Sequence, residues 1–583
     1  MAFLRNLLAS ILGTLFALGI LFFMFLIFAS LASVGDEVRV KPNSVLKLEF
    51  PLPVSEHSTT DPDDPFTIFF EPKMGLDQIV QAIGVAGKDD RIKGISISSP
   101  YLMSGMAQAK AIRDALEDFK AKGKFVYAYG DFYTQKDYYL SSVADSLFIN
   151  PAGNLDFKGL AAEVLFFKDF QEKSGVKMEV VRHGKYKSAV EPFLSDKMSP
   201  ENREQLSSLI QSLWESMRDG IGESRNIPAA TLDQLADSLG GRNPEMALNA
   251  RLVDALVYAD TYEDKLLRES GGKGKHPEFI TLQRYMRYSR KRPIYKGSDE
   301  IAVIYAQGEI LYGEGSPEFI GQGKMTKALR KAREDKDVKA VVVRINSPGG
   351  SALSSELIWR ELQLTRKAKP VVVSLSDIAA SGGYYMAVGG DIILAEPNTI
   401  TGSIGVFTTV PNLSGISEKV GINAEQVGTH HYSMDYSLFE PMREDFREVL
   451  RDGIEDTYQM FLERVSEGRK ISLAKADSLA QGRVWSGKQA LENGMVDDLG
   501  GMPEALELAA EMAGITDFKL QILPRYKTGL ERLMEDLGGG QVSADQVITS
   551  ELGPEWGETI MALKQLLKQE GIQARMPFIL KIN

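Results

Sequence analysis

The sequence predicts an α/β protein in which one domain occurs twice in tandem, after a single membrane-spanning helix. Three observations lead to this fold class. The N-terminal stretch is apolar and carries one charge, short β-branched runs alternate with segments of helical spacing, and one residue pattern recurs 246 positions later (377 − 131 = 246). A chain of 583 residues is also longer than one hydrophobic core usually supports.

The first segment, residues 1–35, is predicted to be a membrane anchor. Residues 6–33 carry no charge and are long enough to cross a bilayer, which takes about 20 apolar residues. A cleavable signal peptide is the alternative, because Ser30-Leu31-Ala32 resembles a processing site, but the apolar region of signal peptides usually has about 7–15 residues. Under the positive-inside rule Arg5 stays in the cytoplasm, which places the chain from Asp36 onward on the other side.

An internal repeat divides the rest of the chain. Residues 131–160 align with residues 377–406 without a gap. The matched residues include Tyr138-Tyr139 with Tyr384-Tyr385, Asp145 with Asp391, Pro151 with Pro397, and Gly159 with Gly405. We therefore expect a first half at residues 44–290, a second half at residues 300–518, and a C-terminal extension at residues 519–583.

Each half is predicted to alternate strands and helices as in a parallel sheet that is buried on both faces. In the second half we expect strands at 340–345, 371–375 and 392–395, with helices at 353–367 and from Ser381 onward. In the first half we expect strands at 95–97, 125–129 and 147–149, with a helix at 106–119. A long helix is expected after each core, at 201–220 and 443–469.

Composition excludes several classes of function. The net charge of −12 argues against a nucleic acid partner, because phosphate binding needs a basic face. The absence of cysteine removes disulfides, thiol nucleophiles and thiolate metal sites. With only five histidines, a metal site built from several histidines has few candidates.

Two glycine-containing turns follow neighbouring strands of the second half, at residues 346–351 and 379–384. Open α/β sheets bind ligands at the carboxyl ends of their strands. Backbone N–H groups of Gly349 or Gly350, together with that of Gly382, suit a carbonyl oxygen that becomes negative. Ser381 would then present its hydroxyl to this oxyanion hole.

A simpler interpretation is that both turns are only tight connections, since glycine and proline occur in most loops and serine is a common N-cap. The repeat argues against it, because Gln135 occupies the position of Ser381 in the first half. A serine nucleophile also needs a base. His430 and His431 are the obvious histidines, but their spacing implies no acid that would orient them.

The motifs at residues 345–350 and 380–384 resemble those of the Clp/crotonase superfamily, whose domain is a ββα spiral. Residues 401–405 and the lysine motif at residues 186–193 are similar to its signal peptide peptidase A branch, in the long, duplicated form. The resemblance implies a Ser/Lys dyad in which Ser381 is the nucleophile, Lys187 is the general base and Ser403 orients the lysine. Each half would then supply one member of the dyad.

A lysine base near neutral pH needs a pKa about 2–3 units below its usual value of about 10.4. Burial lowers the pKa of a lysine, and the residues that flank Lys187 are apolar. Glu191 must point away from Lys187, or its charge would cancel the effect.

The resemblance also implies an activity and a setting. It implies a membrane-anchored serine endopeptidase that degrades cleaved signal peptides and other hydrophobic peptides, without metal or organic cofactor. We expect a homotetramer in the bacterial inner membrane, with the catalytic halves on the periplasmic side. The alternatives are a crotonase-type enzyme acting on acyl-CoA, a catalytically inert scaffold, or a conventional triad with His430 as its base.

Overall fold

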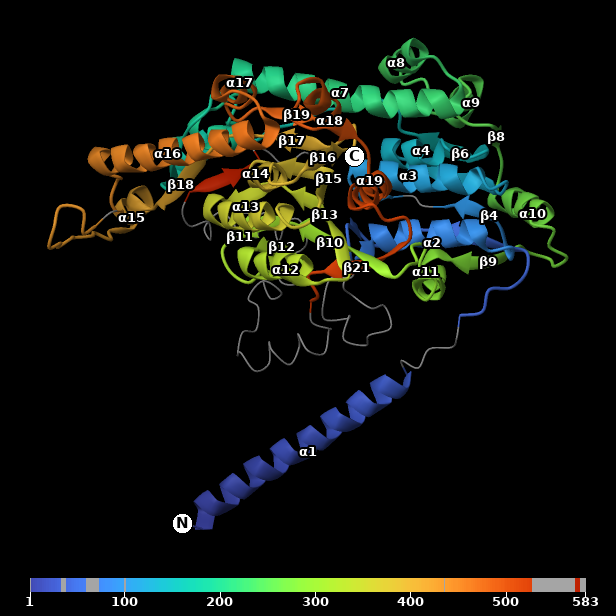
Figure 1. Cartoon of the computed structure of the whole chain (residues 1–583), viewed down its shortest axis with the longest axis horizontal. Coiled ribbons are helices and arrows are strands. Elements are labelled where there is room, and N and C mark those ends of the chain that lie inside the picture. Colours follow the sequence, from blue (N-terminus) through green and yellow to red (C-terminus); the bar gives the residue numbers. More distant parts are fainter. Residues whose placement is uncertain are drawn as a thin grey trace.

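A computed structural model describes residues 2–32, 38–58, 73–98, 101–434, 436–526 and 572–576. Most of the C-terminal extension and the end of the anchor segment lie outside these residues. Helix α1 (Ala2–Ala32) projects away from the α/β body in Figure 1. Within the described part of the chain it is the one helix long and apolar enough to cross a membrane, with a mean hydropathy of 1.7 over Arg5–Phe22.

The first half contains a parallel sheet with the strand order β8-β6-β5-β4-β1-β9. Its strands are β1 (Ser44–Leu48), β4 (Ile92–Ile97), β5 (Phe125–Tyr133), β6 (Ser146–Leu155), β8 (Ala255–Leu256) and β9 (Glu278–Thr281), with a separate pair β2 (Val54–Ser55) and β3 (Met74–Gly75). Its helices are α2 (Leu76–Lys88), α3 (Met106–Lys120), α4 (Gln135–Ser141), α5 (Lys168–Ser174), α6 (Glu191–Leu194), α7 (Pro200–Arg225), α8 (Ala229–Asp237), α9 (Pro244–Asn249), α10 (Ala259–Glu269) and α11 (Leu282–Arg290). Continuous β-branched runs form the central strands because both faces of the sheet are covered.

The second half repeats this arrangement around the order β19-β17-β15-β13-β10-β21; off this path, β16 pairs with β15 and β20 pairs with β16. Its strands are β10 (Asp299–Gln307), β13 (Val338–Ser347), β15 (Val371–Ala380), β16 (Ile392–Ala395), β17 (Ile400–Gly402), β19 (Val484–Ser486), β20 (Asp498–Leu499) and β21 (Phe518–Leu523). Its helices are α12 (Gln322–Glu334), α13 (Ala352–Arg366), α14 (Gly382–Ala387), α15 (Ser414–Val420), α16 (Glu444–Arg469), α17 (Leu473–Leu479), α18 (Gly487–Glu492) and α19 (Met502–Ala513).

The repeat seen in the sequence is a repeat of structure. Helices α2 and α3 have the same lengths as α12 and α13 and lie 246 residues before them. The long helices α7 and α16 both have 26 residues. The prediction of a duplicated α/β fold is therefore confirmed.

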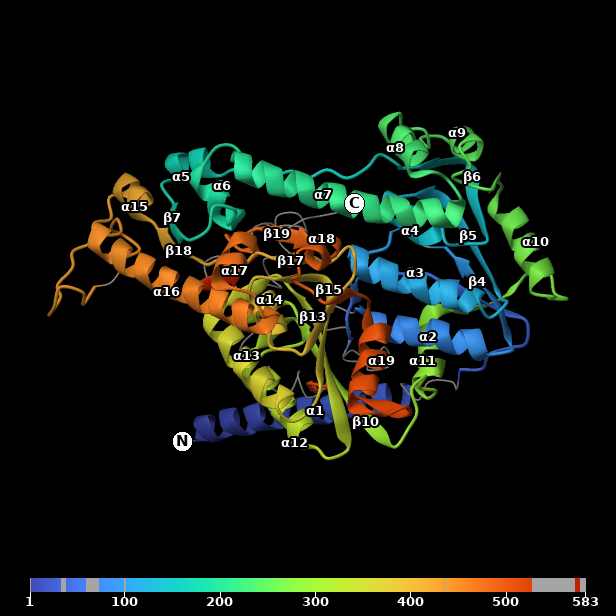
Figure 2. The same cartoon turned by 45° about the horizontal axis from the view of Figure 1, so that its top comes forward.

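A second sheet in the second half takes a strand from the first half. Its order is β12-β11-β14-β22-β18-β7, with β11 (Glu309–Leu311), β12 (Phe319–Gly321), β14 (Gly349–Ser351), β18 (Phe407–Asn412), β22 (Gln573–Arg575) and β7 (Lys177–Arg182). Strand β7 pairs antiparallel with β18, from Arg182 opposite Phe407 to Lys177 opposite Asn412. Helix α7 then runs across both halves, as Figure 2 shows.

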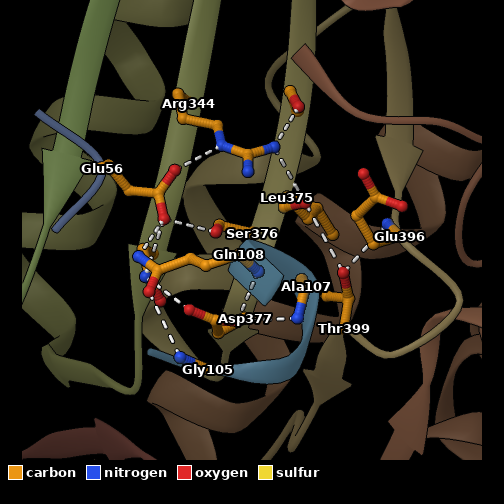
Figure 3. A network of polar contacts seen from close by, with 12 residues as sticks. Glu56, Gly105, Ala107, Gln108, Arg344, Leu375, Ser376, Asp377, Glu396 and Thr399 are labelled. Atoms are coloured by element: carbon orange, nitrogen blue, oxygen red, sulfur yellow. Dashed lines mark hydrogen bonds and ion pairs between the residues drawn. The ribbon is translucent and has the colours of Figure 1, made fainter. Parts of the chain in front are cut away.

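Buried polar side chains also join the two halves (Figure 3). Glu56 of the first half accepts hydrogen bonds from Arg344 Nε at 2.7 Å, Gln108 Nε2 at 2.7 Å and Ser376 Oγ at 2.5 Å. Burial alone would raise the pKa of Glu56, but the charge of Arg344 and these hydrogen bonds hold it below its usual value. The side chains of Glu56 and Arg344 are each 2% exposed. Removing either one would therefore leave an uncompensated buried charge.

Asp377 continues this network toward the end of β15. Its Oδ1 accepts hydrogen bonds from the backbone N–H groups of Ala107 at 2.9 Å and Gln108 at 3.1 Å, in the first turn of α3. The N-terminus of a helix of the first half thus holds a strand of the second half. Burial, with the nearby charge of Glu56, raises the pKa of Asp377 to about 6.

Candidate active site

Ser381 lies at a sharp turn between strand β15 and helix α14. Its backbone has φ +54° and ψ −115°, a conformation that residues other than glycine seldom adopt. Such strain persists where the surroundings hold it, and here the Ser381 N–H donates to the carbonyl of Gly402 at 2.7 Å. The side chain makes no capping hydrogen bond to α14. The interpretation of Ser381 as a simple N-cap is therefore wrong.

Lys187 lies in a loop that leaves β7 and rests on the second half. Pairing of β7 with β18 brings the loop there, and the Tyr186 N–H donates to the carbonyl of Gln481 at 2.8 Å. Gly482, with φ +81°, faces the Lys187 backbone so closely that a Cβ on it would lie 2.5 to 2.6 Å from Lys187 N, Cα and Cβ. Only glycine leaves room for the loop at this point.

The two halves bring the three predicted side chains together. Lys187 Nζ lies 3.0 Å from Ser381 Oγ, 2.9 Å from Ser403 Oγ and 3.0 Å from the Ser403 carbonyl oxygen. All three residues are 0% exposed. The contact with the Ser403 carbonyl was not predicted. The amine is therefore held by three oxygen atoms of the second half, and its residue has no exposed surface.

Burial lowers the pKa of Lys187 well below its usual value, and no charged group among the described residues opposes this shift. Glu191, the nearest acidic residue in the sequence, is held elsewhere: its carboxylate accepts hydrogen bonds from the Ser199 N–H at 3.1 Å and from Asn202 Nδ2 at 2.5 Å. The expectation that Glu191 points away from the amine is thus met. A neutral amine at hydrogen-bond distance from a hydroxyl is placed to accept its proton.

The two predicted turns lie next to each other. Gly349 and Gly350 have φ +97° and +151°, and a Cβ on Gly349 would lie 2.8 Å from the backbone nitrogen of Gly382. The Gly349 N–H already donates to Ser347 Oγ at 3.2 Å. Of the two glycines of the first turn, Gly350 is therefore better placed to donate to a ligand.

The histidines at 430 and 431 lie apart from this site. Both are exposed; His431 Nε2 lies 2.5 Å from Asp445 Oδ2, and His430 Nδ1 lies 3.0 Å from Thr429 Oγ1. Among the described residues the polar contacts of Ser381 Oγ are with Lys187 Nζ and, at 3.5 Å, the Gly405 carbonyl. The geometry gives no support to His430 as a base.

Some residues of the site were missed in the sequence. Gly482 was not singled out, because a lone glycine in a turn gives no sign of which segment packs on it. Strand β22, from the C-terminal extension, lies beside the turn of Gly349 and Gly350, and the sequence had no readable pattern there. Within the described residues no group of three or more His, Asp or Glu side chains could hold a metal ion.

Comparisons with known proteins identify the family of the chain. The family model described as Peptidase family S49 matches twice, at residues 118–271 and 363–516. "Protease 4" of Salmonella typhi is 36% identical over 80% of this chain and 76% of its own length. "Protease 4" of Haemophilus influenzae is 38% identical over 76% of this chain and 73% of its own length.

A plant relative extends the match along the chain. "Serine protease SPPA, chloroplastic" of Arabidopsis thaliana is 31% identical over 93% of this chain and 79% of its own length. The predicted resemblance is thus confirmed, and it excludes the alternative of an acyl-CoA enzyme. The chain belongs to Peptidase family S49 and is a serine peptidase with a duplicated domain.

Proposed function

We propose that the chain is a membrane-anchored endopeptidase in which Ser381 is the nucleophile, Lys187 is the general base and Ser403 orients the lysine. The observation that carries this proposal is the distance of 3.0 Å between Lys187 Nζ and Ser381 Oγ in a fully buried site. The oxyanion donors would be the N–H groups of Gly350 and Gly382, with Gly349 shaping the turn. Both predicted halves, residues 44–290 and 300–518, are then needed for one active site.

The reaction follows from this arrangement. Ser381 Oγ attacks the carbonyl carbon of a peptide bond while its proton moves to Lys187 Nζ. The carbonyl oxygen becomes negative and receives hydrogen bonds from the two backbone N–H groups. Lys187 then gives the proton to the leaving amine, and water releases the acyl group by the same steps. The Ser403 hydroxyl and carbonyl hold the amine in place throughout.

The proposed substrates are cleaved signal peptides and other hydrophobic peptides. Two features support this substrate class. The N-terminal helix would hold the enzyme where such fragments lie, and a cluster of apolar side chains lies beside the catalytic strand. The cluster comprises Leu209 and Leu213 of α7, Ala380, Ile400, Val484 and Met576.

We place the protein in the bacterial inner membrane, with its catalytic halves on the periplasmic side. Arg5, before the apolar stretch, supports this orientation through the positive-inside rule. Bacterial relatives of similar length are consistent with this setting.

The internal repeat supports a homo-oligomer, and we propose a homotetramer. Residues 161–166 correspond to β18 and residues 423–428 correspond to β7, at the same offset of 246, yet neither segment forms a strand. Their side chains include exposed Leu165 and Val427, which is 91% exposed. Pairing of these segments between copies would repeat the contact of β7 with β18, and such head-to-tail contacts close into rings.

The substrate proposal is tested with the full chain in detergent, by following hydrolysis of a signal-peptide fragment and of a polar peptide of equal length. We expect cleavage of the hydrophobic fragment, slower cleavage of the polar peptide, and no cleavage of either by Ser381→Ala. A wild-type protein that is folded but leaves the hydrophobic fragment intact would contradict the proposal, and would favour an inert scaffold.

A further inference from the structure

A polar face of helix α7 contacts the second half of the molecule. Gln205, Ser208 and Ser212 follow one another at helical spacing, so they share one face of the helix. Ser212 Oγ lies 2.6 Å from Ser486 Oγ in β19, and Ser208 Oγ accepts a hydrogen bond from Gln489 Nε2 of α18 at 2.9 Å. Gln205 stands at the end of this face that contacts the loop after β7.

Gln205 contacts the chain on both sides of the proposed base. Its Nε2 donates to the carbonyl of Tyr186 at 3.0 Å and to Ser188 Oγ at 2.8 Å, and these residues are the two neighbours of Lys187 in the sequence. A third acceptor, Asn202 Oδ1, lies 3.1 Å away in the preceding turn of α7. Gln205 is 1% exposed, and a buried polar group that loses its partner is costly. The amide therefore restricts the loop at the residues that flank Lys187.

The carbonyl end of the same amide contacts the strand that holds Ser403. Gln205 Oε1 accepts a hydrogen bond from the Val484 N–H in β19 at 3.3 Å. The carbonyl of the preceding residue, Arg483, accepts a hydrogen bond from the Ser403 N–H at 2.6 Å. One side chain thus links the backbone beside Lys187 to the strand that fixes Ser403, across the boundary between the halves.

The charged side chains around this loop have other partners. Arg182 donates to the Lys187 carbonyl at 2.9 Å, His183 Nδ1 lies 2.6 Å from Glu455 Oε1, Lys185 Nζ lies 5.1 Å from the centre of the Tyr186 ring, Glu191 accepts from Ser199 and Asn202, and Glu204 accepts from Arg483 at 2.7 Å. The shift in the pKa of Lys187 has burial as its cause. A change at Gln205 to another neutral side chain would therefore act on Lys187 through the position of the loop.

We propose that Gln205 is a positioning residue, whose amide holds the loop so that Lys187 Nζ stays buried and within reach of Ser381 Oγ. The inference rests on the proposed dyad and assigns helix α7 a part in keeping it assembled. Without the amide, the loop moves away from β19 and water gains access to the amine. The amine is then less often neutral and less often in contact with the hydroxyl, so kcat falls while peptide binding changes little.

The test compares Gln205→Met with Gln135→Met in the purified full chain in detergent. Both glutamines are 1% exposed and donate to a backbone carbonyl, but the partners of Gln135 are Lys158 and Gly159 of the first half. Gln205→Met should lower kcat for a hydrophobic peptide ester at least about tenfold at pH 7, because misplacement of a reacting group by about 1 Å is costly. KM should change little. Gln135→Met is the matched control and should keep the wild-type kcat.

The pH profile is a readout that a purely structural role would not move. The base must be neutral, so kcat/KM falls on the acid side of the pKa of Lys187. Because burial lowers this pKa, hydration of the amine in Gln205→Met should raise it toward the usual value of about 10.4. The acid limb should therefore move to higher pH, and the deficit in kcat/KM should shrink as the pH is raised. If Gln205→Met does not fold, Ser188→Ala, which removes one acceptor of the amide, should move the limb in the same direction.

Lys187→Met in the same assays separates this inference from the proposed function. If Lys187→Met keeps the wild-type kcat, the dyad fails and the inference falls with it. If Lys187→Met is inactive but Gln205→Met matches Gln135→Met in kcat and in pH profile, the positioning role is overturned and the proposed function stands. A deficit of Gln205→Met that is equal at every pH, or an unmoved limb in Ser188→Ala where that variant is needed, would also overturn it. Melting temperatures and titration of the active serine with a fluorophosphonate give the folded, active fraction of each variant.

Discussion

The two halves of the molecule share one fold but differ at the turn that matters for chemistry. In the second half Ser381 has a positive φ and leaves α14 uncapped, with its hydroxyl 3.0 Å from Lys187 Nζ. In the first half Thr134 caps α4, and Gln135 follows it at the position of Ser381. Gln135 Oε1 accepts hydrogen bonds from the N–H groups of Lys158 and Gly159, both at 2.9 Å. Gln135 Nε2 donates to the Gly159 carbonyl at 3.0 Å. The same turn is closed by side-chain hydrogen bonds in the first half, and in the second half it places a serine hydroxyl beside a lysine amine.

The two halves also differ in strand β7 and the loop after it, which carries Lys187. In the first half β7 is paired with β18, and the loop after it delivers Lys187 into a dry site. In the second half the corresponding segment, residues 423–428, is unpaired, and the nearby His431 is exposed and bound to Asp445. Each half therefore contributes one of the two side chains that meet at the site, Lys187 from the first half and Ser381 from the second.

The largest expected effect comes from removing the side chain at the matched turn of each half. Ser381→Ala should lower kcat by at least about 10³-fold, because the nucleophile is lost. Gln135→Ala should leave kcat of the folded protein unchanged and lower its free energy of unfolding by about 0.5–1.5 kcal/mol, because the partly buried backbone groups of Lys158 and Gly159 lose their hydrogen bonds to the amide. Peptide ester kinetics and thermal unfolding measure both. Equal loss of kcat in the two variants would contradict the division of roles.

The next largest effect is expected from the base. Lys187→Met should lower kcat about 10²–10⁴-fold, the usual contribution of a general base. The same change should raise the free energy of unfolding. Methionine fills the buried space, and no amine then has to lose its proton on folding. His431→Ala, near the position of the second half that corresponds to Lys187, is the control and should keep wild-type kcat.

The stability gain of Lys187→Met should depend on pH. The native pKa of Lys187 lies below the value of about 10.4 in the unfolded chain, so the unfolded state binds more protons and wild-type stability rises with pH. The stability gained by Lys187→Met over wild type should therefore be largest at low pH. It should vanish once the pH exceeds the pKa of lysine in the unfolded chain. Thermal unfolding at pH 7 and pH 10 measures it; an equal gain at both would show that the amine is not neutral in the native site.

Much of this arrangement follows from the sequence. The offset of 246 residues predicts the duplicated helices, and the turns at Gly349 and Ser381 predict that two neighbouring strands end at one site. The approach of Lys187 to Ser381 was not readable from spacing, because it depends on β7 pairing with a strand some 230 residues away; only the resemblance implied it. The place of β22 was also missed, since three residues carry no periodicity and their position is decided by backbone pairing.

A smaller effect is expected from Ser403, whose hydroxyl contacts the Lys187 amine. Ser403→Ala should lower kcat about tenfold, which corresponds to the loss of one hydrogen bond of about 1–1.5 kcal/mol. The effect is small because the amine keeps its contacts with Ser381 Oγ and the Ser403 carbonyl. KM should change little, since the hydroxyl faces the lysine rather than the proposed peptide site. Steady-state kinetics separate the two constants; a loss as large as that of Lys187→Met would mean that Ser403 itself takes part in proton transfer.

The proposed function requires that the amine of Lys187, in the first half, activates Ser381 in the second half. Its most direct test is the rate at which a fluorophosphonate labels the full chain, with the modified residue identified by mass spectrometry. We expect Ser381 to be labelled at the same rate in wild type and in His431→Ala, and at least about 100-fold more slowly in folded Lys187→Met. Labelling of Ser381 at the wild-type rate in Lys187→Met, or labelling of another serine in its place, would contradict it.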